Sequence, residues 1–149
     1  MDNIDNMVVK FIDRAYLLPP HDSMRKKVAI IGERNRQATE GTLTRKLMDK
    51  FNLRRRNIKI YTKTHKFKAE YAEQFDVLIG TRPCDGEVEI LEGAAKYKKK
   101  FILTPCTCGR LQRKIPKLIR EHPVIGQIEA MVSRLPNRTA DFAWMILYN

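Results

Sequence analysis

The chain has 149 residues, of which 43% are hydrophobic, so it is long enough for one globular domain with a substantial core. No run approaches the roughly 20 apolar residues that span a membrane, the acidic N-terminus does not resemble a secretory signal, and three cysteines do not make a disulfide framework. We therefore expect a cytoplasmic protein without a membrane partner, whose net charge of +12 attracts polyanions.

Helices and strands are expected to alternate through the first half of the chain. Apolar residues recur at spacings of three and four in residues 3–18, which predicts an amphipathic helix that Pro19 ends. The run KVAIIG at 27–32 is continuously apolar after its lysine and ends in glycine, as is typical of a buried parallel strand. A helix at 42–51 and a strand at 57–62 follow.

The same alternation continues in the second half. Residues 66–74 predict a short helix or turn, and FDVLIGT at 75–81 predicts another buried strand. Residues 85–98 have acids at the start and lysines at the end, which matches the dipole of a helix. A strand at 100–104 comes next. The chain is then expected to form helices at 111–121 and 124–135 and a final strand at 141–148.

This order of elements predicts one α/β domain over residues 1–149, with the helix at 3–18 as its N-terminal element. Alternating strands and helices favour right-handed βαβ units, and therefore a three-layer, Rossmann-like fold around a mostly parallel sheet. Residues 28–31, 76–80 and 101–103 should be adjacent parallel strands with helices on both faces, because their apolar runs do not alternate with polar residues.

Polar segments follow three of the expected strands, and they predict a ligand site. They begin at Gly32, Thr81 and Pro105. Because ligands bind outside the carboxyl ends of parallel strands, we expect 81–85 and 105–108 to line one cleft, with Glu33 at its rim. Ordinary turns that end strands use the same Pro, Gly and Asp residues, and they are the alternative explanation.

Residues 75–109 resemble part of certain class I S-adenosylmethionine-dependent methyltransferases. Arg82-Pro83-Cys84-Asp85 is similar to the His-Pro-Cys-Asp motif that follows one strand of that family, with arginine in place of histidine. Pro105-Cys106-Thr107-Cys108 is similar to the Pro-Cys-Cys or Cys-X-Cys motif after the next strand. The resemblance also extends to the last strand, and it implies that this strand is antiparallel.

The resemblance implies S-adenosylmethionine as cofactor and RNA or a protein as methyl acceptor. Two alignments of the first strand are open. In one, Gly32 opens a glycine-rich turn that lacks its other glycines. In the other, which we prefer, IIGERN is the second strand and Glu33 holds the ribose hydroxyls. The implied cofactor-binding residues are Gly32, Glu33, Thr81, Pro83, Cys106 and Cys108.

Cys84 and Asp85 are the candidate catalytic residues. Cys84 is similar in placement to the Pro-Cys nucleophile of RNA cytosine-5 methyltransferases, and Arg82 and the following helix could lower the pKa of its thiol. Asp85 would cap that helix and present a carboxylate to the cleft. A buried structural cysteine is the alternative. The three cysteines could also belong to a metal- or redox-responsive protein, although zinc usually takes four ligands and no histidine stands at a recognisable spacing.

The positive charge is concentrated after residue 22. Residues 1–22 carry a net charge of −2, so residues 23–149 carry +14. We expect RNA as a partner, with Arg54, Arg55 and Arg56 on its phosphates, and DNA is also compatible. Tyr61, Phe67 and Tyr71 could stack on bases, although a core role is expected for at least two of them. A non-catalytic basic module that binds nucleic acid on the same fold is therefore the alternative to an enzyme.

Overall fold

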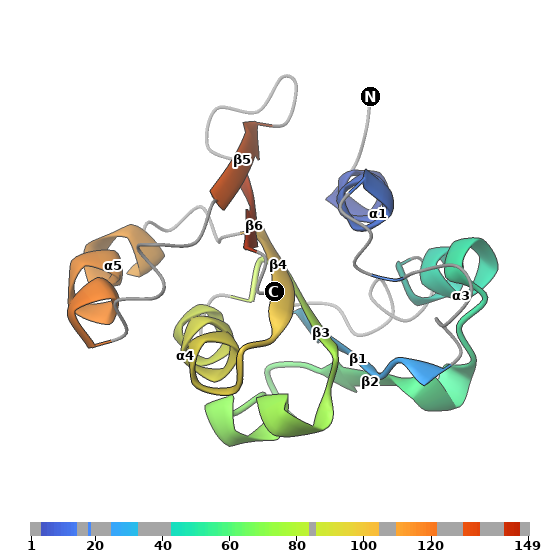
Figure 1. The fold of residues 1–149 in the computed structure, drawn as a ribbon, viewed down its shortest axis with the longest axis horizontal. Helices are drawn as coiled ribbons and strands as arrows, with labels where there is room; N and C mark the ends of the chain where they lie inside the picture. Colours follow the sequence, from blue (N-terminus) through green and yellow to red (C-terminus); the bar gives the residue numbers. More distant parts are fainter. Residues whose placement is uncertain are drawn as a thin grey trace.

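A sheet with the strand order β2-β1-β3-β4-β6-β5 forms the centre of the computed structural model (Figure 1). The structure describes residues 4–14, 18, 25–32, 43–83, 86–104, 110–121, 130–134 and 142–146. The strands are β1 (Val28–Gly32), β2 (Ile58–Tyr61), β3 (Val77–Thr81), β4 (Lys100–Thr104), β5 (Ala130–Arg134) and β6 (Phe142–Ile146). The helices are α1 (Ile4–Arg14), α3 (Arg45–Phe51), α4 (Glu87–Tyr97) and α5 (Arg110–Glu121), with 3₁₀ helices η3 (Arg55–Asn57) and η4 (Ala69–Gln74).

Strands β2, β1, β3 and β4 are parallel, which confirms the expected parallel sheet. All of β1 is buried, and β3 is buried up to its last residue, as their continuous apolar runs predict. In register, Gly32 lies beside Thr81, and Thr81 lies beside Thr104. The carboxyl ends of three adjacent strands therefore stand in a row at one edge of the sheet.

Two further strands extend the sheet beyond β4. β6 pairs antiparallel with β4, with Trp144 opposite Leu103, and β5 pairs antiparallel with β6. The predicted helix at 124–135 is therefore wrong for residues 130–134, which form β5. In this short apolar segment, pairing with β6 decides the conformation. Helical and strand periodicities are hard to distinguish over so few residues.

Helices cover both faces of the sheet, as predicted. Val28 and Ile30 of β1 contact one apolar layer, to which α1 and α3 contribute. Ala29 and Ile31 point to the opposite layer, which is built with α4 and η4 and includes Leu118 of α5. Figure 1 shows α1 and α3 on one side of the strands and α4 and α5 on the other. The strands thus contribute alternate residues to two cores.

The N-terminal helix α1 belongs to the first of these layers. Its Val8 and Ile12 are completely buried. Lys46 of α3 donates a hydrogen bond to Asn6 at 2.5 Å, and Lys50 forms an ion pair with Asp13 at 3.5 Å. Apolar burial and polar contacts therefore both join α1 to α3. Among the helices described here, none is long and apolar enough to cross a membrane.

Candidate functional site

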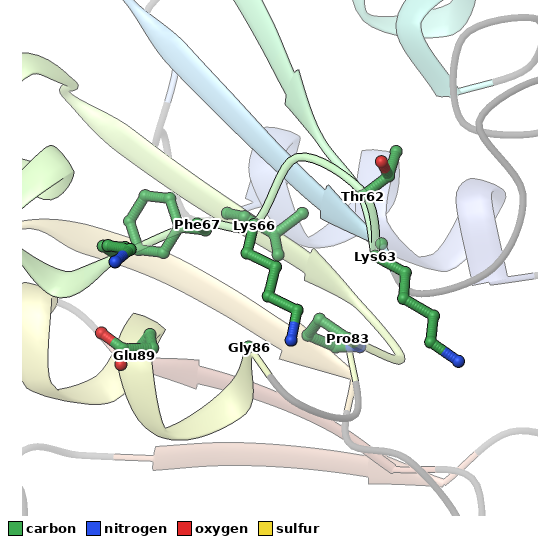
Figure 2. A pocket seen from close by; sticks show the side chains of 10 residues that line it. Thr62, Lys63, Lys66, Phe67, Pro83, Gly86 and Glu89 are labelled. Atoms are coloured by element: carbon green, nitrogen blue, oxygen red, sulfur yellow. The ribbon is translucent and has the colours of Figure 1, made fainter.

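A pocket of about 230 Å³ opens at the carboxyl edge of the parallel strands (Figure 2). The chain continues from β1 to α3 on one face and from β3 to α4 on the other, so the strand order reverses between these two neighbours. Doubly wound sheets bind their ligands at such a reversal. The pocket is lined by Ile31, Gly32, Thr62, Lys63, Lys66, Phe67, Lys68, Pro83, Gly86 and Glu89.

The turn after β2 supplies one wall of the pocket. The backbone N–H of Thr62 donates to the carbonyl of His65 at 3.0 Å, and the hydroxyls of Thr62 and Thr64 are 3.1 Å apart. These contacts close a tight turn that presents Lys63 and Lys66 at the pocket. In Figure 2 the side chain of Lys66 extends toward Pro83 and Gly86, whereas Lys63 extends away from them.

The start of α4 forms the opposite wall. Gly86 precedes the helix, and its backbone N–H donates to the carbonyl of Pro83 at 2.5 Å. A Cβ on Gly86 would lie 3.1 Å from Cγ2 of Ile31, so the absence of a side chain lets α4 begin close to β1. Glu89 accepts a hydrogen bond from the backbone N–H of Ala69 at 2.6 Å, which joins α4 to η4.

The pocket combines an apolar part with a cationic part. Ile31, Phe67 and Pro83 are buried and supply apolar surface. Lys63, Lys66 and Lys68 supply three positive charges, against the single carboxylate of Glu89 among the described lining residues. The described lining is therefore positive overall. It can bind a ligand in which an anionic group lies next to a flat apolar group.

An aromatic cluster supports this wall from behind. Tyr61 and Phe67 are each 3% exposed, and their rings meet edge to face with centroids 5.2 Å apart. Tyr71 stacks on Tyr61 at 5.8 Å. Burial raises the pKa of Tyr61 above its ordinary value, and the nearby Tyr71 raises it further. Tyr61 and Phe67 are thus core residues, as expected for at least two of the three aromatics.

Two of the predicted cofactor-binding residues, Gly32 and Pro83, line this pocket. Thr81 lies beside it in the strand register, but its hydroxyl is directed to the carbonyl of Ile31, at 3.5 Å. Thr104, next to Thr81, is completely buried, and its hydroxyl has no hydrogen-bond partner among the described residues. The other predicted site residues lie outside the described residues and stay predictions: Glu33, Cys84, Asp85, Cys106 and Cys108.

The predicted nucleic-acid-binding arginines lie at the far end of β2 from the pocket. Arg54, Arg55 and Arg56 are all exposed, in and just before η3. The guanidinium of Arg55 donates to the carbonyl of Ile58 at 3.1 Å, so this side chain supports the entry into β2. Arg54 contributes through its backbone, whose N–H donates to the side chain of Asn57 at 3.2 Å.

Sequence reasoning missed the pocket lysines and Glu89. A signal for the lysines was present, because residues 50–68 contain eight Lys and Arg residues and no Asp or Glu. This run follows the edge of the sheet and ends at the pocket. No comparable signal marked Glu89, whose place at the pocket depends on how α4 packs against η4.

The described lining is electrostatically unfavourable for the sulfonium of S-adenosylmethionine. Its sulfonium gives this cofactor a positive charge, which three lysines would oppose. β2 ends at Tyr61, and this residue and the following Thr62 and Lys63 offer no carboxylate for ribose hydroxyls. Glu89, the one carboxylate of the described lining, already accepts a hydrogen bond from Ala69.

The sheet order bears on the two open alignments of the first strand. β1 pairs directly with both β2 and β3, which is the central place that the opening strand takes in a doubly wound sheet. This placement agrees with the alignment in which Gly32 ends the opening strand. In the part of the chain that the structure describes, no three His, Cys, Asp or Glu side chains gather to hold a metal ion, and all three cysteines lie outside that part.

Comparisons with known proteins find distant similarity in structure. The sequence matches no protein-family model and no curated protein. A methyltransferase from Pyrococcus furiosus is 16% identical with a TM-score of 0.45, over 91% of this chain and 81% of that one. A precorrin-6y C5,15-methyltransferase from Geobacter metallireducens GS-15 is 14% identical with a TM-score of 0.44, over 91% and 87%. Neither likeness is close enough to define a family or an activity for this chain.

Proposed function

We propose that this chain is a Rossmann-like domain that binds an anionic nucleotide in the pocket between the ends of β1 and β3. The observation that carries the proposal is the juxtaposition of Lys63, Lys66 and Lys68 with apolar surface at the reversal of strand order. A nucleotide has the same two parts, a flat base and charged phosphates. The volume of about 230 Å³ lies below the ~300–1,000 Å³ of most ligand pockets, which favours a mononucleotide over a dinucleotide.

Electrostatics favour the nucleotide over S-adenosylmethionine in this pocket. At an effective dielectric constant near 20, two opposite unit charges about 4 Å apart attract by about 4 kcal/mol, before desolvation is counted. A like pair at this distance repels by the same amount. Lysines that attract a phosphate therefore repel a sulfonium at the same place. The difference in electrostatic energy between the two ligands is larger than either interaction energy alone.

Calorimetric titration with adenosine, AMP, ADP, ATP, S-adenosylmethionine and S-adenosylhomocysteine tests this proposal. Affinity should rise with the number of phosphates and fall as salt is added. Lys66→Gln should weaken ATP binding by about tenfold, on the scale of a hydrogen bond to a charged group. Lys114→Gln removes the same charge from α5 and should leave the affinity unchanged. Equal affinity for adenosine and ATP, or no binding at millimolar ligand, would contradict the proposal.

Methyl transfer from S-adenosylmethionine to RNA or a protein is the second candidate function. One observation favours it: Pro83, from the motif that resembles the methyltransferases, lines the pocket. Here Cys84 and Asp85 would be the catalytic residues. In the same titration, S-adenosylmethionine would then bind more tightly than ATP, and Lys66→Gln would not weaken it. Incorporation of a labelled methyl group into RNA or protein would establish this activity. Nucleotide binding without any turnover would instead support the non-catalytic module.

A further inference from the structure

We infer that the edge of the sheet along β2 binds the backbone of a single-stranded nucleic acid and directs one of its nucleotides into the pocket. The inference rests on the proposed function, because the pocket would bind the nucleotide at the end of the nucleic-acid strand. The surface consists of Arg54, Arg56, Lys59, Lys63 and Lys66, and we call it the β2 track. These residues lie before, within and after β2, and all are exposed.

The β2 track lies in a stretch of chain with one sign of charge. Residues 50–68 contain no acidic residue, and they include Lys50, Arg54, Arg55, Arg56, Lys59, Lys63, Lys66 and Lys68. Unbroken positive charge along an edge is complementary to a polyphosphate backbone, and each phosphate contact releases counterions. Lysines on an edge strand also prevent pairing with other chains. Protection of the edge does not, however, require that Asp and Glu be absent from the residues before and after β2.

The geometry of β2 makes the track continuous. Among the described strands, β2 pairs with β1 alone, so its other edge has no strand partner in the described part of the chain. Lys59 lies on the same face as Tyr61, with its Nζ 5.9 Å from the centre of that ring. The extended part of the track, Ile58–Tyr61, spans roughly 10 Å at about 3.3 Å per residue, and cationic residues lie before and after it, so the track can contact more than one phosphate.

The track ends at the pocket, and this favours a single strand. Lys63 and Lys66 belong to both features. The exposed ring of His65 stacks on Tyr61 with centroids 5.3 Å apart, which supplies an aromatic surface beside them. Bases of a single strand are free to stack on such a surface. A base in a duplex would first have to leave its stack, which costs a few kcal/mol.

Fluorescence anisotropy with a labelled RNA oligonucleotide of about ten residues tests the inference. The variant Arg54→Gln/Arg56→Gln/Lys59→Gln leaves the pocket intact, and it keeps Arg55 because that guanidinium holds the carbonyl of Ile58. We expect its RNA affinity to fall by about tenfold or more at low salt. The slope of log K against log salt should flatten by roughly 2, at about 0.7 per phosphate contact. Binding of a mononucleotide should not change.

A variant with the same loss of charge provides the control. Arg113→Gln/Lys114→Gln/Arg120→Gln removes three exposed charges from α5, which Figure 1 shows on the opposite side of the molecule from β2. This variant should keep its RNA affinity within about twofold. An equal loss in both variants would overturn the inference, because net charge alone would then explain binding. Tighter binding to duplex RNA, or equal competition by polyglutamate, would overturn it as well.

The two proposals can fail separately in this experiment. If the β2-track variant binds RNA more weakly while the wild-type protein binds no mononucleotide, contact of the track with the RNA backbone is supported and nucleotide binding in the pocket is contradicted. If mononucleotides bind and both charge variants keep their RNA affinity, nucleotide binding in the pocket is supported and RNA binding by the β2 track is contradicted. A single-stranded DNA of the same sequence completes the set. Equal affinity for DNA and RNA supports recognition through phosphates, and weaker binding of DNA adds a contact to the 2′-hydroxyl.

Discussion

Tyr61 is the last residue of the edge strand β2, and its ring belongs to the aromatic cluster behind the pocket. Its ring contacts His65, Phe67, Tyr71 and Phe75. Burial raises the pKa of its phenol above the ordinary value of 10.0, and Tyr71 adds to the rise. The folded chain therefore holds this proton more firmly than the unfolded chain does. The consequence is a stability that depends on pH in the alkaline range.

The sign of this dependence follows from the order in which the two states ionise. Well below pH 10, both states carry the proton, and the contribution of Tyr61 to stability is fully present. As the pH rises through 10, the unfolded chain releases its proton first, so the free energy of unfolding falls. The loss continues until the folded phenol also ionises.

We therefore predict that Tyr61→Phe reduces the alkaline loss of stability. The free energy of unfolding, measured by urea denaturation at several pH values between about 8 and 11, should decline less steeply in this variant than in the wild type. Tyr97→Phe removes a phenol outside the cluster and serves as the control for the loss of a tyrosine hydroxyl. Parallel curves for wild type and Tyr61→Phe would contradict the assigned shift.

At the scale of elements, α4 and η4 approach each other closely enough to exclude a side chain. A Cβ added to Gly93 would lie 2.8 Å from the carbonyl oxygen of Ala69 and 2.8 Å from the Cβ of Ala72. These atoms belong to the backbone or are attached directly to it, so they cannot move aside alone. The same contact positions Glu89 on Ala69 and so shapes one wall of the pocket.

We predict that Gly93→Ala destabilises the protein by roughly 1–3 kcal/mol, the usual cost of overpacking. The sign of this change in stability is informative, because replacing glycine by alanine in a helix interior otherwise stabilises a protein by about 1 kcal/mol. Gly80→Ala is the matched comparison. Its added Cβ would meet the ends of the Ile90 and Leu103 side chains, both at 2.7 Å, and these ends can shift. Urea denaturation should show the larger loss for Gly93→Ala, and a stabilised Gly93→Ala would refute the close approach.

At the scale of the whole molecule, the sheet separates two apolar layers. Ile12 of α1 is completely buried in one, and Leu91 of α4 is 2% exposed in the other. Strands β1, β3 and β4 contribute to both layers through alternate residues. Loss of packing on either face should therefore weaken the same structure, which is the behaviour of a single cooperative domain.

We predict that Ile12→Ala and Leu91→Ala each lower the free energy of unfolding by about 2–5 kcal/mol, in one transition. The transition can be monitored by far-UV circular dichroism and by the fluorescence of Trp144 in β6, the only tryptophan. Asp13→Ala, which removes an exposed ion pair with Lys50, should cost less than about 1 kcal/mol. Two separate transitions, or a variant that affects one probe alone, would contradict a single domain over residues 1–149.

Local patterns in the sequence were enough to predict most of the parallel sheet. Continuous apolar runs predicted β1, β3 and β4, and the range 100–104 coincides with β4. Such runs are informative because a strand buried on both faces has no solvent side on which a polar residue could stand. The pattern failed at residues 130–134, where the strand depends on its partner β6. A partner strand that lies outside the window of residues considered leaves no mark within it.

The sequence by itself determined the fold class, the parallel strands and the strong positive charge, because burial and charge are properties of each residue and its near neighbours. Tertiary structure alone decided that β1 lies between β2 and β3, which creates the reversal at which the pocket opens. It also brought Lys63 and Lys66 to Pro83 and Gly86, about twenty residues further along the chain. A ligand site depends on side chains that converge from several strand ends, and their distances in space are set by the packing of the whole sheet.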